Sequence, residues 1–334
     1  MTALSDKGPV AVTGGTGFVG SHLVEHLLAR GYTDIRCLVR RNPGWLEGLP
    51  VVRIPGDMND VEALERLLSG AEQVFHVAAV TRARSWKDMH RANVEGTENL
   101  LRAATKACPH VQRIILTSSL AAVGRADVAV PDESAPLRPV SMYGRSKMEM
   151  ERVAEPYMDR LPVTIIRPPA VYGPRETDIF SFIQILSRGL CPIVGRGTEP
   201  SLSLVHVSDL AAGMVGAAES DASTGKCWFM GSAEVFSWHE IRDAVRQALG
   251  RRVVTLHIPR SVVPVVGALS EWVGRLMGTY PPLNRDKARE ILHAATMCSS
   301  ERAMQHLGYR PGVSLSDGMH MTVEWYRKKG WLPS

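Results

Sequence analysis

A tyrosine and a lysine lie four positions apart near the middle of the chain, at Tyr143 and Lys147. If this stretch is helical, positions i and i+4 share a face, and the lysine ammonium lies beside the phenol. A free tyrosine has a pKa of about 10, and a neighbouring cation lowers that value by favouring the phenolate. The phenol could then move a proton to or from a substrate oxygen at neutral pH. The alternative is a charged pair on the surface of a helix.

A serine at the end of a predicted strand supports a catalytic role for this tyrosine and lysine. Residues 113–117 form an apolar, β-branched run that predicts a buried strand, and Thr117, Ser118 and Ser119 end it. Ligands of open parallel sheets bind at the carboxyl ends of the strands. Ser119 could therefore hold a substrate oxygen at that edge while Tyr143 moves the proton.

The clearest motif is the glycine-rich segment 13–20, TGGTGFVG, between the first predicted strand and the first predicted helix. Its glycines would allow a sharp turn, a close approach of the backbone to a pyrophosphate, and close packing of helix on strand. The amides at the helix N-terminus would face the phosphates. An ordinary strand–helix turn is the alternative. The residues predicted here to bind a dinucleotide are Gly14, Thr16, Gly17, Phe18, Val19 and Gly20.

The end of the second predicted strand bears on which dinucleotide binds. NAD sites usually carry an acidic residue about 20 residues after the last glycine, bonded to the ribose 2′-hydroxyl. That position is Arg40, with Arg41 beside it and Arg36 within the strand, whereas Asp34 precedes the strand. Arginine suits a 2′-phosphate, so the sequence favours NADP over NAD. The alternative is that these arginines are solvated.

Further cofactor contacts are predicted where other strands end. Asp57, in Gly-Asp-Met after the third strand, could bond an adenine amino group, although a turn aspartate is equally compatible. Small residues after His76 would let the backbone touch the cofactor, and His76 itself is expected to be a buried, hydrogen-bonded histidine. The cofactor residues predicted on these strand ends are Asp57, Met58, Val77, Ala78, Ala79 and Thr117.

The elements that would position these residues alternate along the first half of the chain. Strands are predicted at 10–13, 35–39, 51–54, 73–77, 113–117 and 163–167, with helices at 17–30, 61–68 and 89–107. This alternation predicts an α/β fold, a doubly wound parallel sheet of the Rossmann type. Two more strands are predicted at 203–207 and 226–230, and helices at 238–249, 262–277, 285–292, 300–306 and 316–328.

The later part of the chain predicts a second, smaller and mostly helical domain. We expect a dinucleotide-binding domain at 7–171, completed by about 201–231, and a substrate domain at 172–200 and 232–330. The chain has 334 residues, 45% of them hydrophobic, and a formal charge of +5, which excludes disordered and collagen-like classes. Five cysteines without a CxxC spacing predict neither disulfides nor a metal site and favour a reducing cytoplasm.

These motifs together resemble one family, the extended short-chain dehydrogenases/reductases of the NAD-dependent epimerase/dehydratase type. The likeness extends over nearly the whole chain and is closest in character to bacterial 3β-hydroxysteroid dehydrogenase-like members. It implies an enzyme with NAD or NADP as cofactor. The stretches that carry it are TGGTGFVG (13–20), FHVAA (75–79), RANVEGTENLL (91–101), TSS (117–119), YGRSK (143–147), RPPAVYGPR (167–175) and VHVSDLA (205–211).

The resemblance implies roles for particular residues. Ser119, Tyr143 and Lys147 match the family's catalytic triad, in which the lysine also bonds the nicotinamide ribose. Asn93 matches an asparagine that supports the lysine through water or backbone contacts. The segment with Pro168, Ala170 and Val171 matches the one that fixes the nicotinamide face. Tyr172 and Arg175 begin the path into the substrate domain.

The substrate class is predicted from two apolar stretches. Leu120-Ala121-Ala122 stands where sugar epimerases often have a polar side chain, which argues against a sugar substrate. Residues 262–277 are apolar nearly all round, as a domain core, a cap over a hydrophobic ligand or a membrane-interface helix with Arg260, Trp272 and Arg275 would be. We expect an oxidoreductase that interconverts a secondary alcohol and a ketone on a hydrophobic, sterol-like substrate (a 3β-hydroxysteroid or a sterol-4α-carboxylate).

Two other functions stay open: a nucleotide-sugar epimerase or dehydratase with tightly bound NAD, and a non-catalytic dinucleotide-binding protein. By resemblance we expect a homodimer formed by helices 89–107 and 143–158. We expect a cytoplasmic protein, with peripheral membrane contact through 260–277 as an alternative. The basic cluster of Arg82, Arg84 and Lys87 is too small to predict a nucleic-acid partner.

Overall fold

A seven-stranded parallel sheet forms the centre of the computed structural model, which describes residues 7–277, 281 and 283–333. Its inner strands are buried along their whole length, which explains why they are apolar runs without alternation. In spatial order the strands are β10 (Cys227–Phe229), β6 (Val163–Arg167), β5 (Arg113–Thr117), β4 (Gln73–His76), β1 (Val10–Thr13), β2 (Ile35–Val39) and β3 (Val52–Pro55). The predicted α/β Rossmann class is confirmed.

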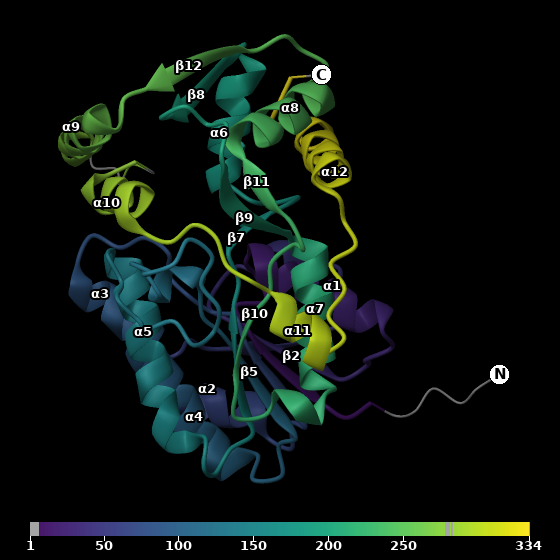
Figure 1. The fold of residues 1–334 in the computed structure, drawn as a ribbon. Helices are drawn as coiled ribbons and strands as arrows, with labels where there is room; N and C mark the ends of the chain where they lie inside the picture. The colour runs from purple at the N-terminus through teal and green to yellow at the C-terminus, as the bar shows by residue number, and fades with distance from the viewer. Residues whose placement is uncertain (1–6, 278–280, 282, 334) are drawn as a thin grey trace.

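Helices cover both faces of this sheet (Figure 1). One apolar cluster joins the sheet to α1 (Phe18–Ala29) and α7 (Val207–Ala218). A second cluster joins the other face to α2 (Val61–Leu68), α4 (Gly96–Ala107) and α5 (Met142–Ala154). The short helix α3 (Trp86–His90) runs into α4 through a π-helical turn, Arg91–Glu95, so the predicted helix 89–107 is interrupted.

Most of the rest of the chain builds the upper part of the molecule in Figure 1. A three-stranded sheet has the order β11 (Val235–Ser237), β9 (Pro200–His206), β7 (Ala170–Tyr172), and β12 (Val254–Ile258) pairs in parallel with β8 (Leu190–Val194). A third apolar cluster lies among α6 (Asp178–Ser187), α8 (Trp238–Leu249) and α12 (Leu315–Lys328). The remaining helices are α9 (Val263–Leu276), α10 (Arg285–His293) and α11 (Glu301–His306).

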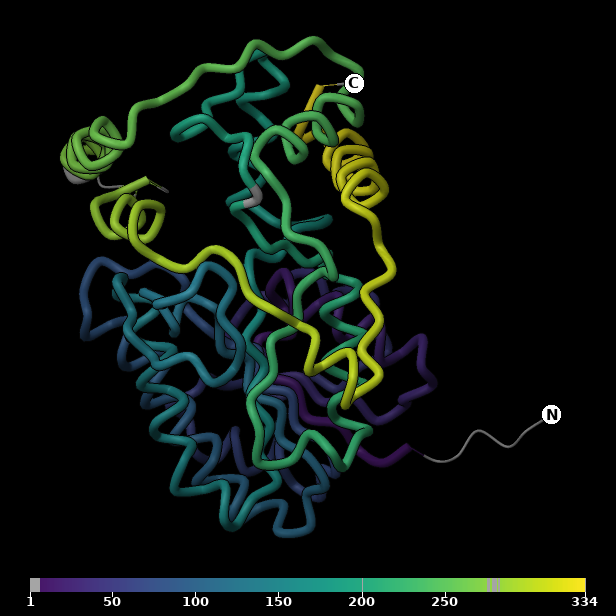
Figure 2. The backbone as a smooth tube through the Cα atoms, viewed as in Figure 1, coloured from purple at the N-terminus to yellow at the C-terminus, as the bar shows by residue number. Residues whose placement is uncertain are grey.

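The path of the chain interleaves these two parts, as Figure 2 shows. After β9 the chain forms α7 and then β10, which is the outermost strand of the large sheet beside β6. It then returns to the upper part and later passes α11, which packs against β10. The domain boundaries therefore stay a prediction.

No helix of the described residues is long and apolar enough to cross a membrane. All five cysteines are unpaired.

Candidate active site

The glycine-rich turn has the geometry of a phosphate cradle. Gly14 has a positive φ of 77°, and a Cβ there would come within 2.5 Å of the backbone nitrogen of Ala78. Gly20 packs so closely on Gly14 that a Cβ would overlap its carbonyl oxygen. At Gly17 the nearest atom to a Cβ is 3.4 Å away, so the protein leaves this position open.

The first turn of α1 has no side-chain cap and no acidic residue, so its amides are available to an anion. Gly17 is exposed, and Thr16, Phe18 and Val19 are half-buried beside it. Opposite them, Val77 and Ala78 are half-buried and Ala79 is exposed, directly after β4. These residues fit a dinucleotide pyrophosphate at this place.

The arginines of β2 divide into two groups. Arg40 and Arg41 are exposed directly after the strand, at the carboxyl edge of the sheet. Arg36 lies near the other end, where Asp34 accepts from its guanidinium at 3.1 and 2.7 Å and the Ser69 carbonyl accepts a further bond at 2.5 Å. Its assignment to the cofactor is wrong, because these partners hold it away from the carboxyl edge.

Asp57 and Met58 follow β3 at the same edge. Asp57 is exposed and its Oδ1 accepts from the Asn59 amide at 2.7 Å, as in an aspartate-led turn, so its bond to adenine stays a prediction. Met58 packs against the apolar cluster of α2 and α4. Its side chain thus contributes to the core.

Tyr143 lies in the first turn of α5, which Ser141 caps by accepting from the Gly144 amide at 3.0 Å. A Cβ on Gly144 would overlap the carbonyl oxygen of Ala121, so only glycine lets α5 approach the segment after β5 this closely. This close approach brings the Ser119 hydroxyl near enough to the Tyr143 phenol to act on its pKa. Ser119 Oγ also accepts from the Ala121 amide at 3.1 Å.

Lys147 is buried on the same face of α5. Its Nζ donates to the Thr117 carbonyl at 2.6 Å and lies 5.9 Å from the centroid of the Tyr143 ring. Burial lowers the pKa of Lys147 to about 8, against the opposing charge of Glu151. The ammonium therefore titrates near neutral pH.

The expected lowering of the phenol pKa is wrong for this structure. Burial raises the pKa of Tyr143 to about 12, the hydrogen bond with Ser119 opposes the rise, and the charge of Glu290 on α10 adds to it. Lys147 does not offset this burial, although its Nζ lies 5.9 Å from the ring centroid. Tyr143 is accordingly a phenol at neutral pH.

Asn93 holds the chain after β4. Its side-chain oxygen accepts from the Val80 amide at 2.7 Å, and its Nδ2 donates to the Val80 carbonyl at 2.9 Å and to Ser146 Oγ at 2.8 Å. It thus ties the Val77–Val80 backbone to α5 through the neighbour of Lys147. The structure gives no direct bond between Asn93 and Lys147 among the described residues.

Backbone contacts place the remaining predicted cofactor residues. The Pro168 carbonyl accepts from the Leu120 amide at 2.9 Å, which fixes the segment leading to Ala170 and Val171 beside the end of β5. Thr117 contributes its carbonyl to Lys147, while its buried hydroxyl has no partner.

Sequence reasoning missed a buried network beneath this site. Glu151, one helical turn after Lys147, accepts from Arg167 at 2.9 and 2.6 Å and from Ser118. Glu151 could have been found from the sequence, because it lies four positions after Lys147 and therefore shares its helix face. Asp286 on α10 was also missed: its carboxylate accepts from the Met142 amide at 3.0 Å. No local pattern signals that contact, since the two residues are far apart in the sequence.

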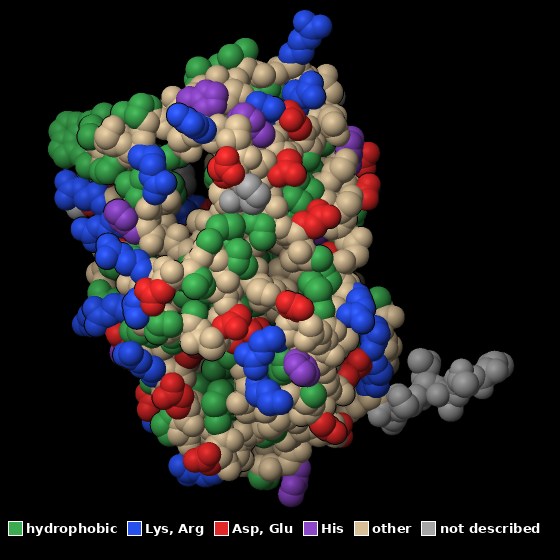
Figure 3. Space-filling view, in the orientation of Figure 1, with side chains coloured by type: hydrophobic (Ala, Val, Ile, Leu, Met, Phe, Trp, Pro, Cys, Tyr) green, Lys and Arg blue, Asp and Glu red, His purple; other side chains and the backbone are tan. Residues whose placement is uncertain are grey.

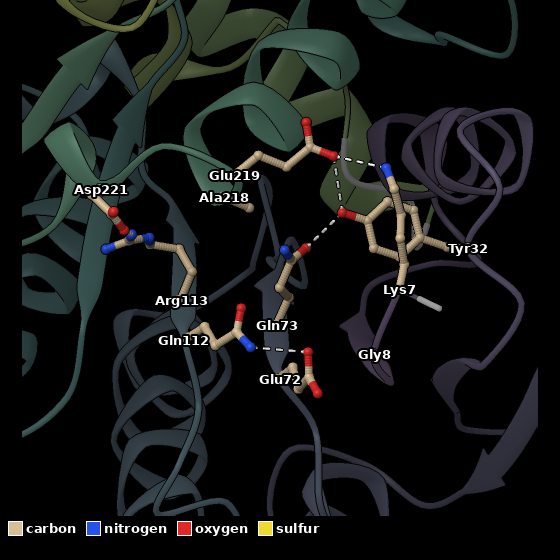
Figure 4. Close-up of a pocket in the computed structure, with 10 residues that line it drawn as sticks. All are labelled: Lys7, Gly8, Tyr32, Glu72, Gln73, Gln112, Arg113, Ala218, Glu219 and Asp221. Carbon is tan, nitrogen blue, oxygen red and sulfur yellow. Dashed lines mark hydrogen bonds and ion pairs between the residues drawn. The ribbon is translucent and has the colours of Figure 1, made fainter. Parts of the chain in front are cut away.

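A separate cavity of about 300 Å³ lies at the opposite edge of the sheet, at the amino ends of β4 and β5 (Figure 4). Glu219 accepts there from Lys7 at 2.9 Å and from Tyr32 at 3.1 Å, and Arg113 pairs with Asp221 at 3.2 Å. These side chains pair with one another, although the buried Nε of Arg113 has no partner among the described residues. The cavity is not part of the candidate active site.

A family model described as the NAD dependent epimerase/dehydratase family matches residues 10–231. The chain belongs to this family. The predicted recognition is confirmed, and so is the prediction of a dehydrogenase/reductase enzyme that depends on a nicotinamide dinucleotide.

Relatives of several names match over the whole length. The chain is 32% identical to a ceramide reductase of Caulobacter vibrioides, covering 99% of this chain and 98% of the relative. It is 30% identical to a 3 beta-hydroxysteroid dehydrogenase/Delta 5-->4-isomerase of Mycobacterium tuberculosis, covering 96% and 91%. A dTDP-glucose 4,6-dehydratase structure from Streptomyces venezuelae with NAD bound has a TM-score of 0.77 at 26% identity, covering 97% and 99%.

Proposed function

We propose that this protein interconverts a secondary alcohol and a ketone on a hydrophobic, sterol-like substrate with a nicotinamide dinucleotide. The observation that carries the proposal is that Ser119, Tyr143 and Lys147 lie together at the carboxyl edge of the sheet, with Lys147 on the same helix face as Tyr143. Leu120 and Ala122, directly beside Ser119, are buried and apolar. The names of two relatives, a ceramide reductase and a hydroxysteroid dehydrogenase, support a lipid as substrate.

Each side chain has one task in this proposal. The bound nicotinamide supplies the hydride for ketone reduction, or accepts it in alcohol oxidation. Ser119 donates to the substrate oxygen and orients it, and Tyr143 gives that oxygen its proton. In alcohol oxidation Tyr143 removes the hydroxyl proton as a phenolate. Lys147 holds the nicotinamide ribose with the donors that the Thr117 carbonyl leaves available.

We extend the proposal to a preference for NADP. Arg40 and Arg41 are exposed directly after β2, and no acidic residue stands there to accept from a 2′-hydroxyl. A guanidinium makes charge-assisted bonds to a phosphate, which a 2′-phosphate would provide. The family description and the dehydratase structure name NAD, so the two cofactors are compared directly in the test.

The second candidate is a nucleotide-sugar dehydratase or epimerase. The likeness to the dTDP-glucose 4,6-dehydratase structure favours it. The apolar segment after Ser119 argues against it, because that segment offers no polar side chain for sugar hydroxyls. A non-catalytic dinucleotide-binding protein is the third candidate, and the presence of serine, tyrosine and lysine together argues against it.

The proposal is tested with the purified protein, NAD(H) and NADP(H), and panels of hydroxysteroids and 3-ketosteroids, followed by absorbance at 340 nm. We expect turnover with at least one panel member, and more with the NADP form than with the NAD form. Tyr143→Phe should reduce turnover by about 100-fold or more, because general acid–base catalysis is removed. Tyr157→Phe, outside the site, is the matched control. Absence of turnover, combined with tightly held NAD and stabilisation by UDP, would support the dehydratase or epimerase instead.

Two predictions about the setting belong to the same proposal: a cytoplasmic protein and a homodimer formed by 89–107 and 143–158. The dimer would form through the outward faces of α4 and α5, and these faces are largely charged. Their exposed residues are Glu98, Arg102, Thr105, Lys106, Arg145 and Arg152. A dimer at this face would need ion pairs between copies, and light scattering at varied salt would detect its weakening.

A further inference from the structure

The helix α9 has its large apolar side chains on the outside. Its buried positions are Val263, Gly267 and Gly274, and a Cβ on Gly267 would lie 2.9 Å from the Asn284 carbonyl oxygen at the start of α10. Every exposed side chain described between 262 and 277 is apolar. The side chains of Arg275 and Leu276 lie outside the described residues. We call the following set the α9 apolar face: Val262, Val265, Val266, Leu269, Trp272, Val273 and Met277.

The exposure of these side chains is large. Val265 is 66% exposed, Leu269 59%, Trp272 58% and Met277 71%. Figure 3 shows hydrophobic side chains gathered at the upper left of the molecule, where Figure 1 places α9. Contiguous apolar patches of this kind on a water-soluble surface mark an interaction site. Of the three interpretations left open for 262–277, packing into the core of its domain does not fit, because most of the large apolar side chains of the helix face out.

The charges beside this face are complementary to an anionic surface. Arg260, just before α9, and Arg285 and Arg289 on α10 are exposed, and the exposed Lys287 forms an ion pair with Glu290. Figure 3 shows Lys and Arg side chains gathered along the same edge, below the apolar corner. The acidic groups of the region have partners within the protein. Glu271 accepts from the Arg285 amide at 3.3 Å, Asp286 from the Met142 amide at 3.0 Å, and Glu290 from Lys287 at 2.6 Å.

We propose that the α9 apolar face inserts into the surface of an anionic phospholipid bilayer, with the basic residues of α10 on the headgroups. An interfacial helix has this combination of an apolar face with Trp and Leu and flanking Lys and Arg. A second copy of this chain is the less favoured occupant, since two such faces would bring their basic borders together.

The docked face is connected to the candidate active site through α10. Asp286 bonds the amide that precedes Tyr143, and Glu290 acts electrostatically on the Tyr143 phenol, so α10 lies over the start of α5. The same helix packs against the inner side of α9. Docking would therefore hold Tyr143 near the bilayer, where a hydrophobic substrate is dissolved. This last step rests on the proposed function, whereas the docking itself does not.

Flotation of the full chain with vesicles tests the docking without any substrate. We expect the protein to float with vesicles of phosphatidylcholine and phosphatidylglycerol, to bind phosphatidylcholine alone much more weakly, and to lose binding as salt rises. Leu269→Asp and Trp272→Asp should each weaken binding about tenfold or more, because a carboxylate enters the apolar layer. The matched control is Met321→Asp, which places the same charge at an exposed apolar position of α12.

Three results would overturn the proposal. One is that the protein does not float with the anionic vesicles, and another is that Leu269→Asp and Trp272→Asp float as the parent protein does. The third is that the protein is a dimer that Leu269→Asp dissociates, without vesicle binding, which would assign the face to a second copy. Turnover of a water-soluble ketone, measured in parallel, should be the same in both variants as in the parent. If the parent protein itself turns over no ketone, the proposed function is contradicted, whereas the docking is unaffected.

Discussion

At the scale of single residues, the protonation state of the Tyr143 phenol decides which direction of the proposed reaction the site favours. Burial raises the pKa of Tyr143 to about 12, so the phenol holds its proton in the neutral range. This state suits ketone reduction, in which Tyr143 is the acid. Alcohol oxidation needs the phenolate, whose fraction rises with pH up to the phenol pKa. The two directions of the proposed reaction should therefore depend on pH differently.

Ser119 tunes this balance, because its hydrogen bond lowers the pKa of Tyr143 against the effect of burial. We expect Ser119→Ala to move the rise of kcat/KM for alcohol oxidation to higher pH, since the phenol pKa increases when the bond is removed. A spectroscopic titration of the phenol, taken as the difference between each protein and its Tyr143→Phe counterpart, measures the shift. Ser134→Ala, on an exposed loop, is the control. A phenol that titrates in Ser119→Ala as it does in the parent protein, with turnover reduced, would limit Ser119 to orienting the substrate.

The residues of this site could be predicted only in part from the sequence. Ser119, Tyr143 and Lys147 follow from a motif and a strand end, and the structure brings them together. The sign of the Tyr143 pKa shift could not be predicted, because it depends on burial and on Glu290, which is distant in the sequence. Arg36 was misassigned because its two partners, Asp34 and the Ser69 carbonyl, are set by tertiary packing.

At the scale of elements, a chain of hydrogen bonds joins the ends of β1 and β4 to α4. Thr13 Oγ1 and His76 Nδ1 are 2.7 Å apart, and His76 Nε2 and Thr97 Oγ1 are 2.9 Å apart. Thr97 donates in turn to the Asn93 carbonyl at 2.7 Å. With Nε2 protonated, every member of the chain is satisfied. The neutral ring of His76 thus positions the π-helical turn that carries Asn93, as expected of a buried histidine.

Acid should loosen this connection. Burial, with the charge of Lys147, lowers the pKa of His76 to about 3, whereas an unfolded histidine titrates near 6.5. Between these values the unfolded chain binds a proton that the native protein does not, so the free energy of unfolding falls as pH falls. The loss reaches about 4 kcal/mol at the low end.

His76→Gln should flatten the decrease of the unfolding free energy between pH 6.5 and 4, while costing about 1–2 kcal/mol at neutral pH for the altered hydrogen bonds. Urea unfolding at several pH values measures both effects. His110→Gln, on an exposed loop, is the control and should leave the slope unchanged. An equal slope in His76→Gln and the parent protein would show that His76 does not carry the acid sensitivity.

The predictability of elements follows their burial. Most of the first six strands of the large sheet were found because buried parallel strands are continuous apolar runs, whereas β3 is largely exposed and was found from its β-branched residues. β12 alternates between exposed and half-buried positions and pairs only with β8, and both were missed among prolines and glycines. α7 was missed because small residues dominate it. The predicted strand 203–207 extends one residue too far, since β9 ends at His206 and Val207 begins that helix. α9 was found, but its exposed face is apolar, against the usual pattern of a surface helix.

At the scale of the whole molecule, Arg175 connects the two parts. It follows β7 with a positive φ of 78°, the only such non-glycine residue in the described chain. Its guanidinium donates to Ser21 Oγ at 2.8 Å and Glu25 Oε1 at 2.5 Å on α1, and lies 5.1 Å from the ring centroid of Trp45. The ring centroids of Trp45 and of Trp325 on α12 lie 5.5 Å apart. The helix that begins at the glycine-rich turn is thus joined to the upper part.

Two substitutions separate the backbone and side-chain contributions of Arg175. Arg175→Ala removes the bonds to α1 and keeps a Cβ at positive φ, so we expect a loss of about 2–3 kcal/mol of unfolding free energy. Arg175→Gly removes the same bonds but relieves the backbone, and should be more stable than Arg175→Ala by about 1 kcal/mol. Urea unfolding measures the difference. If Arg175→Gly proves less stable than Arg175→Ala, the backbone at this junction is not strained, and its conformation is set by the chain around it rather than by the contacts of the arginine. If Arg175→Gly is the more stable variant, as we expect, the guanidinium bonds hold a strained turn and thereby hold the upper part over α1.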